Sequence, residues 1–382
     1  MEYILSAASF GAFFFALLVV GKKNKALHER LLISWLIYQG LFIGLYLLSF
    51  QFLFAQEDGF SAFIVSGFLL HGPFLFLYTW SLTSGKKKLM TRDFLHFVPF
   101  LLFVAYLSVA FRFPDYAVGI SLDHVHTQHA PPVLFVFFLL LTVVSGPIYF
   151  LWSMIMMGHY KTRLLENFSA TGKINLHWLR LLLPIFGVIW TILISIGVMH
   201  HVFHIGSMEL CINGLFVCLS AFVFLMGYFG LKQQAVFIVY PTVPLAVESP
   251  PDKGEEVKEK YSGVNLTDEE IAAYVTAITQ YMEVDKPFLN SDLTLTMLAA
   301  ELDIPTHHVS RILNEQFDRN FFDFINGYRV EDVKAKLVDP DYSHFSLLGI
   351  AYDAGFNSKS AFNRIFKKAT GQTPSEYKKL HS

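Results

Sequence analysis

Seven long apolar stretches fill the first 231 residues, and a more polar chain with helical periodicity follows them. About 20 apolar residues in helical form cross a bilayer core of roughly 30 Å. The stretches that reach this length are 3–20, 31–51, 60–83, 94–112, 132–157, 178–199 and 208–231. The pattern predicts seven transmembrane helices. The first is not expected to be a cleaved signal peptide, because Glu2 stands where such a leader carries basic residues.

Basic residues near these stretches predict how the helices are oriented. Three alternate loops and their borders hold twelve of them, namely Lys22, Lys23, Lys25, Arg30, Lys86, Lys87, Lys88, Arg92, Lys161, Arg163, Lys173 and Arg180. The intervening loops, near 52–59, 113–131 and 200–207, hold none. Because short basic loops stay on the cytoplasmic side, we expect the N-terminus outside the membrane and residue 232 onward in the cytoplasm.

Seven apolar helices are also compatible with a transporter or channel. A transport path is usually marked by ionisable residues inside the membrane, since burying them in lipid is costly. Here they are scarce: His71 lies in the third stretch and Glu209 near the outer end of the seventh. The sequence also shows no obvious inverted repeat. The pattern therefore disfavours transport.

The outer loops carry an unusual group of histidines. Its members are His124, His126, His129, His200, His201 and His204. Imidazoles of this kind bind Zn, Cu or Ni and titrate near neutral pH, so one interpretation is an outer-face sensing site. No spacing among them matches a defined metal motif. Polar loop residues at a membrane interface are the favoured interpretation, and the sequence names no metal.

A segment rich in Pro and charge separates the apolar part from the rest. It covers 232–264 and cannot bury enough apolar surface to order itself. The chain is therefore expected to comprise a sensor module over 1–231, this linker, and a soluble domain over 265–382. With only two cysteines, both within one apolar stretch, the sequence shows no disulfide framework.

The soluble domain begins with a helix signal and then repeats itself. Thr267 and Glu270 form a capping-box pattern at the start of an amphipathic helix. Further on, 298–299 matches 350–351 at an offset of 52, and 309–313 matches 362–366 at an offset of 53. The offset changes between the helices of each unit, where a turn tolerates an insertion. The repeat indicates two copies of one helical unit.

Each copy has the layout of a helix-turn-helix. The first is predicted as helices 295–302 and 306–317 and the second as helices 347–354 and 358–369, with a helix over 321–337 between them. Gly355 supplies a turn position in the second copy that favours positive φ. Two units in register are a far more specific signal than one.

The second helix of each unit has an apolar and a polar face. Helical spacing turns Val309, Ile312 and Leu313 inward, like Phe362, Ile365 and Phe366. Arg and Asn side chains read guanine and adenine, while Lys and Ser reach phosphates or bases. The candidate DNA-binding residues on the outer faces are His307, Ser310, Arg311, Asn314, Lys359, Ser360, Asn363, Arg364 and Lys367.

Charge supports this interpretation only locally. Residues 262–382 contain 12 basic and 17 acidic residues, so the domain is acidic overall. Residues 359–379 nevertheless contain six basic residues and one acidic residue, which is the local face that DNA phosphates require. A helical protein-interaction module with a solvated basic face is the alternative.

At these residues the last ~115 positions resemble the DNA-binding domain of the AraC/XylS family of bacterial regulators. The stretch GIAYDAGFNSKSAFNRIFKKATGQTPSEYKK, 349–379, is similar to the family signature almost throughout. The resemblance implies two recognition helices in successive major grooves, and RNA polymerase as a partner. One departure is Asp318, which stands where the family usually has Gly, so we expect the first recognition helix to end differently. The apolar half resembles, by layout alone, the seven-helix modules fused to such domains in some bacteria.

The expected fold is all-α: a seven-helix transmembrane bundle plus a cytoplasmic AraC-type domain with two helix-turn-helix units. The expected function is a one-component transcription regulator in the bacterial inner membrane that senses a signal through its bundle and binds promoter DNA. Membrane lipid, an unknown signal ligand and a second copy of the chain are further expected partners, and no cofactor is expected. The sequence shows no phosphate loop, nucleophile elbow or kinase motif, so an enzyme is not expected. The alternative is a transporter-like protein with a regulatory or protein-docking tail.

Overall fold

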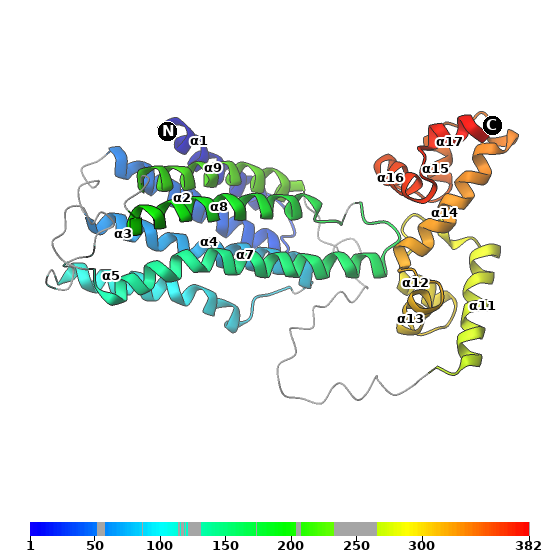
Figure 1. Cartoon of the computed structure of the whole chain (residues 1–382), viewed down its shortest axis with the longest axis horizontal. Helices are drawn as coiled ribbons and strands as arrows, with labels where there is room; N and C mark the ends of the chain where they lie inside the picture. The colour runs from blue at the N-terminus through cyan, green and yellow to red at the C-terminus, as the bar shows by residue number, and fades with distance from the viewer. Residues whose placement is uncertain are drawn as a thin grey trace. The chain divides into compact units, whose positions relative to one another are not determined.

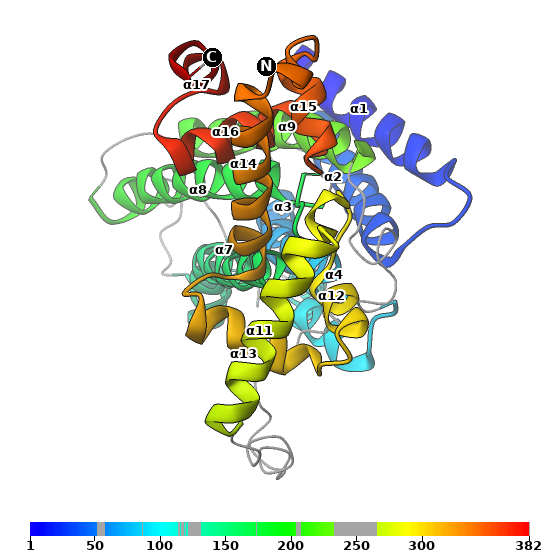
Figure 2. The same cartoon turned by 90° about the vertical axis from the view of Figure 1, so that its right-hand side faces the viewer.

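The computed structural model describes residues 1–51, 58–85, 87–113, 115, 118, 120, 131–172, 174–203, 208–232 and 266–381. Side chains at 49–51, 58–61, 189, 193, 197, 198, 200–203 and 208–211 also fall outside the description. All regular elements within the described residues are helices, as Figures 1 and 2 show. This confirms the all-α fold class. The predicted linker, 232–264, lies outside the described residues apart from Lys232, and its role as a linker stays a prediction.

By its contacts the chain forms two compact units. Unit 1 comprises Met1–Gly158 with Leu176–Val247, and unit 2 comprises His159–Asn175 with Glu248–Ser382. Residues 159–175, which the charge pattern places in the loop between the fifth and sixth apolar stretches, thus belong to unit 2.

The helices of unit 1 follow the predicted apolar stretches. In chain order they are α1 (Glu2–Val20), α2 (Leu27–Gln51), α3 (Asp58–Gly67), η2 (Phe68–Leu70), α4 (His71–Ser84), η3 (Thr91–Phe97), α5 (Val98–Arg112), α7 (Val133–Asn167), α8 (His177–Phe203) and α9 (Met208–Lys232). Within the described part of the chain, seven helical segments are long and apolar enough to cross a membrane. The third joins α3, η2 and α4, and the fifth, α7, continues to Asn167, well past the predicted end at 157.

The packing of unit 1 leaves much apolar surface outside. Phe10, Leu101 and Val133 are 72%, 59% and 87% exposed. Helices of this composition in water would bury such a stripe, whereas helices in lipid expose it. Inside, small residues allow close approach: a Cβ on Gly11 would lie 2.9 Å from the ring of Phe224, so α1 and α9 meet at that glycine.

Unit 2 contains the two repeated units. Its helices are α11 (Asp268–Val284), η4 (Pro287–Leu289), α12 (Leu295–Glu301), α13 (Thr306–Gln316), α14 (Phe321–Val338), η5 (Pro340–Tyr342), α15 (Leu347–Asp353), α16 (Lys359–Thr370) and α17 (Pro374–His381). The four predicted helix-turn-helix helices and the connecting helix are confirmed to within a residue at each end.

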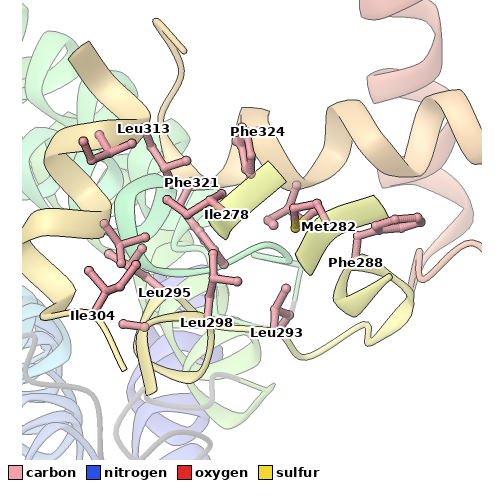
Figure 3. Close-up of a cluster of buried hydrophobic side chains, with 14 of the residues drawn as sticks. Ile278, Met282, Phe288, Leu293, Leu295, Leu298, Ile304, Leu313, Phe321 and Phe324 are labelled. Atoms are coloured by element: carbon pink, nitrogen blue, oxygen red, sulfur yellow. The ribbon is translucent and has the colours of Figure 1, made fainter. Parts of the chain in front are cut away.

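Two hydrophobic cores hold these helices, one for each repeat. Figure 3 shows the first core, in which Ile278 and Met282 of α11 meet Leu298 of α12 and Leu313 of α13. The second core packs Ile350 and Ala351 of α15 against Phe362 and Phe366 of α16. Helix α14 contributes to both, with Phe324 in the first and Val333 in the second. The connecting helix is therefore the element that the two repeats share.

Side-chain caps fix where these helices begin. The predicted capping box is present at α11, where Thr267 accepts from the Glu270 N–H and Glu270 accepts from the Thr267 N–H. Ser358 caps α16 by accepting from the Ala361 N–H at 3.2 Å. Such caps satisfy N–H groups that have no partner inside a helix.

Candidate nucleic-acid interface

The polar face of α16 is the clearest candidate for DNA contact. Phe362, Ile365 and Phe366 are buried, as predicted from helical spacing. The candidate residues on the opposite face are all exposed, namely Lys359, Ser360, Asn363, Arg364 and Lys367. The guanidinium of Arg364 has no carboxylate partner among the described residues. It is therefore available to grip a guanine edge or a phosphate.

The polar face of α13 is arranged differently. Val309, Ile312 and Leu313 are buried as predicted, while His307 and Asn314 are exposed and Ser310 and Arg311 half-buried. Nε of Arg311 lies 2.9 Å from both carboxylate oxygens of Glu315, one turn further along the helix. Nδ2 of Asn314 donates to the Ser310 carbonyl oxygen at 2.8 Å. The first recognition helix therefore presents an Arg that is already engaged by a carboxylate.

The turns of the two units share one backbone conformation. Gly355 has φ +89°, which confirms the predicted positive φ, and Asp303 at the equivalent position has φ +52°. The following residues, Ile304 and Phe356, each donate an N–H over five residues, to Ala299 and Ala351, at 3.0 Å. Their common geometry fixes the angle between the paired helices in both repeats.

The end of α13 differs from that of α16 in its closing hydrogen bond, as expected from Asp318, but not in the backbone region of this residue. This residue adopts φ +49°, the same left-handed region as Gly371 with φ +77° at the matching position of the second unit. The N–H of Arg319 then donates to the Leu313 carbonyl oxygen at 3.1 Å and closes the end of α13. A short Asp side chain tolerates this region better than most residues do. The two recognition helices thus share a left-handed residue after the last turn, but in α16 the closing bond runs from the Gly371 N–H to the Lys367 carbonyl oxygen at 2.9 Å.

A buried cation, which the sequence did not reveal, lies at the middle of α14. Arg329 is 1% exposed. Its Nε donates to the Phe288 carbonyl oxygen at 2.7 Å, and its Nη2 to the Asn290 carbonyl oxygen at 2.8 Å. Burial lowers its pKa to about 10, and Asp292 opposes the shift. Arg329 therefore stays charged at neutral pH and depends on acceptor oxygens.

The segment that follows α7 supplies two further acceptors. Nη1 of Arg329 donates to the Ser169 carbonyl oxygen at 3.2 Å, and Nη2 to Oγ of Ser169 at 3.1 Å. Asn326 donates to the same carbonyl oxygen at 2.9 Å. Ser169 donates its N–H and its hydroxyl to the Leu293 carbonyl oxygen, and Phe168 forms an isolated antiparallel bridge with Thr294. No sequence pattern predicts this contact, because its two halves lie over 120 residues apart.

The outer histidines cannot be assessed from the structure. His124, His126, His129 and His204 lie outside the described residues, and His200 and His201 lie in α8 with side chains outside the description. Among the described residues, no group of three or more His, Cys, Asp or Glu is placed to hold a metal ion. The sensing interpretation of these histidines stays a prediction.

Comparisons with known proteins find matches to the region that contains the repeat. Residues 298–380 match a family model described as a helix-turn-helix domain. An uncharacterised HTH-type transcriptional regulator of Staphylococcus aureus (strain COL) is 31% identical over 104 residues, 27% of this chain and 13% of that protein. The melibiose operon regulatory protein of Escherichia coli (strain K12) is 32% identical over 88 residues, 23% of this chain and 28% of that protein.

A solved structure of a Listeria innocua protein of unknown function is also similar. It is 27% identical, with a TM-score of 0.25, and the match covers 28% of this chain and 97% of that one. The chain thus spans a small fraction of the length of the curated relatives it matches.

The repeat and the family model define an AraC-type helix-turn-helix domain over residues 298–380. This domain is similar to parts of proteins that are named as transcriptional regulators.

Proposed function

We propose that the protein is a membrane-bound one-component regulator that senses a signal through unit 1 and binds promoter DNA through α13 and α16. The observation that carries the proposal is the pair of repeated helix-turn-helix units, with exposed polar faces, in a chain that also has seven helices long enough to cross a membrane. One polypeptide then holds both an input and an output element.

The charge pattern supports a location in the bacterial inner membrane with the N-terminus outside. Twelve basic residues border alternate loops, and this bias keeps those loops in the cytoplasm. Unit 2 is then cytoplasmic, where DNA is. A reporter enzyme active only outside the cytoplasm, fused at residue 120 or at residue 232, tests the orientation. Activity is expected for the first fusion alone, and the reverse result would refute the topology.

DNA recognition is proposed to rest chiefly on α16. Its Arg364 is exposed and has no carboxylate partner among the described residues. One helix-turn-helix domain makes only a modest DNA contact, so a second copy of the chain on adjacent sites is part of the proposal. RNA polymerase is proposed as a partner on the family resemblance.

The test is DNA binding by the full chain in lipid nanodiscs. Sites selected from a random DNA library are expected to share a motif, and Arg364→Ala should weaken binding about 5- to 150-fold and relax one position of the motif. Lys334→Ala is the control, since it removes equal charge from a residue already paired with Glu331 at 2.7 Å. Sites bound equally well by wild type and Arg364→Ala would refute the role of α16. Failure to select any motif would favour the protein-docking alternative.

A further inference from the structure

A cavity within unit 1 combines apolar walls with buried polar atoms that have no partner. It has a volume of about 100 Å³ and lies between α2, α4, α7, α8 and α9. Trp35, Gln39, His71 and Trp190 all line it. Both amide atoms of Gln39, both ring nitrogens of His71 and Nε1 of each Trp are buried without a hydrogen-bond partner in the described structure.

Such a concentration of unpaired groups needs a physical reason. Leaving a buried polar group unpaired is costly, and native proteins contain few such groups. Gln39 is 1% exposed and Trp35 is 3% exposed, so bulk water does not reach them. The rings of Trp190 and Phe150 pack directly against Gly146 and Gly187, two lining residues without a side chain. A Cβ at these glycines would lie 2.6 Å from Trp190 and 2.7 Å from Phe150. The arrangement is typical of a binding site rather than of a packed core.

We propose that this cavity binds a small uncharged molecule that is mainly apolar and carries a hydrogen-bond acceptor such as a carbonyl group. The two indole N–H groups and Nε2 of Gln39 are donors, and a carbonyl oxygen, with two lone pairs, can accept from two of them. None of the described lining residues is Asp, Glu, Lys or Arg, which disfavours a charged ligand. An apolar cavity of about 150 Å³ admits benzene, and this cavity is smaller, at about 100 Å³, so it fits a five-membered ring better than a six-membered one. The inference rests on the proposed function, in which unit 1 receives the signal.

The probes are cyclopentanone and cyclopentane, which share a shape and differ in the carbonyl oxygen. All five tryptophans lie in the first 231 residues, so the intrinsic fluorescence of the full chain in nanodiscs reports on this unit. Cyclopentanone is expected to change the fluorescence saturably, and cyclopentane to do so with at least tenfold lower affinity. Gln39→Leu and His71→Leu should each weaken cyclopentanone binding at least tenfold.

Both variants remove unpaired buried groups and should fold at least as well as the wild type, which thermal unfolding checks. Ser108→Ala, on an exposed part of α5, is the control and should leave binding unchanged. A response that does not saturate, or that is equal in the wild type and both variants, means that water or bulk lipid alone occupies the cavity and overturns the proposal. The DNA test with Arg364→Ala is unaffected by that outcome, so the two failures are distinguishable.

A second inference rests on an independent observation, the packing of residues 159–175 against the other helices of unit 2. Ser169 bonds to Arg329 and Asn326 of the shared helix α14, and to Leu293 just before α12. Leu165, one turn earlier, packs against the second core. The segment therefore contacts the shared helix, the start of the first repeat and the core of the second repeat. These elements determine the positions of the two recognition helices.

We infer that residues 159–175 couple the position of α7 to the spacing between α13 and α16. Helix α7 is continuous from Val133 to Asn167, so a shift along it reaches Ser169 without an intervening loop. Ser169 supplies two of the acceptors of a buried cation. Displacing it leaves Arg329 short of partners, and α14 must then rearrange to satisfy them.

Spin labels at the exposed positions Gln316 and Ala369, with Cys211 and Cys218 replaced by Ala, measure the spacing in the full chain. Ser169→Pro removes the N–H that donates to Leu293 and should undock the segment, broadening a narrow distance distribution. Ser169→Ala, a milder variant, should broaden it less. Gly172→Ala is the control, because its Cβ would meet nothing within 4 Å. If the distance distribution between the two labels is as narrow in both Ser169 variants as in the control, the inference is overturned.

Discussion

The guanidinium of Arg329 and the backbone and hydroxyl oxygens of Ser169 form a buried contact, at 3.2 and 3.1 Å, between residues 160 positions apart. Both residues are 1% exposed. A buried cation that is held by neutral oxygen atoms depends on each of these acceptors. Ser169 is thus a structural part of the DNA-binding unit, although it lies far from that unit in sequence.

Ser169→Ala is expected to lower the free energy of unfolding of unit 2 by about 1–3 kcal/mol, because Nη2 of Arg329 loses one of its two acceptors. Resistance of the C-terminal domain to proteolysis in the full chain, titrated with urea, measures it. Ser343→Ala, at an exposed position, is the control. Equal urea midpoints for the two variants would show that Ser169 contributes nothing to the stability of unit 2.

Gly355→Ala is expected to destabilise unit 2 severely, by about 3 kcal/mol or more. The φ of +89° strains any side chain, and the new Cβ would lie 2.3 Å from the Phe288 carbonyl oxygen. Gly371→Ala is the matched control, with φ +77° but no atom within 4 Å, and should cost only about 1–2 kcal/mol. Urea unfolding of the two variants separates the steric cost from the conformational one. Similar losses would contradict the close approach at Gly355.

Glu315→Gln should strengthen DNA binding by roughly three- to tenfold, because it releases Arg311 and removes a negative charge beside the phosphates. The exposed pair holds Arg311 only weakly, so little stability is lost. The affinity of the full chain for its selected site measures the gain. Glu331→Gln, which removes an acidic residue on α14, should produce no comparable gain. If both variants bind alike, the Arg311–Glu315 pair does not restrain DNA contact.

His308 should make unit 2 less stable in mild acid. Burial lowers its pKa below the ordinary value of 6.5, and the adjacent His307 adds to the shift. The folded domain thus takes up this proton less readily than the unfolded chain. Stability is therefore full above pH 6.5 and declines as the pH falls from there through the folded pKa. His308→Asn should reduce the decline, measured as urea midpoints from pH 7 to pH 5, and an unchanged decline would assign it to other groups.

Periodicity and repetition were enough to predict the elements of the fold. Apolar length identified the seven helices, and the repeated pattern around Ala299 and Ala351 located both helix-turn-helix units. The polar faces of α13 and α16 followed from helical spacing, since Ile312 and Phe366 must face a core. Local sequence carries these features because they depend on neighbours three or four residues apart.

The remaining features depend on contacts that local sequence does not record. Asp318 adopts a left-handed backbone like that of Gly371, which the identity of its side chain does not predict. The partner of Arg311 follows from a choice of rotamer toward Glu315. The hydrogen bond between Ser169 and Arg329 joins segments that are distant in sequence, so local patterns do not predict it. His71 stood out in the sequence as a rare intramembrane ionisable residue, but only the fold places it beside Gln39 in a cavity.

Arg311 is paired with a carboxylate, whereas Arg364 has no such partner among the described residues, and this difference has a consequence for the promoter. Both recognition helices belong to one chain in tandem, so no twofold axis relates them, and they present different side chains. A DNA site read this way has polarity: reversing it end for end gives a different and poorer site. The orientation of that site relative to the start of transcription then becomes a variable that regulation can use.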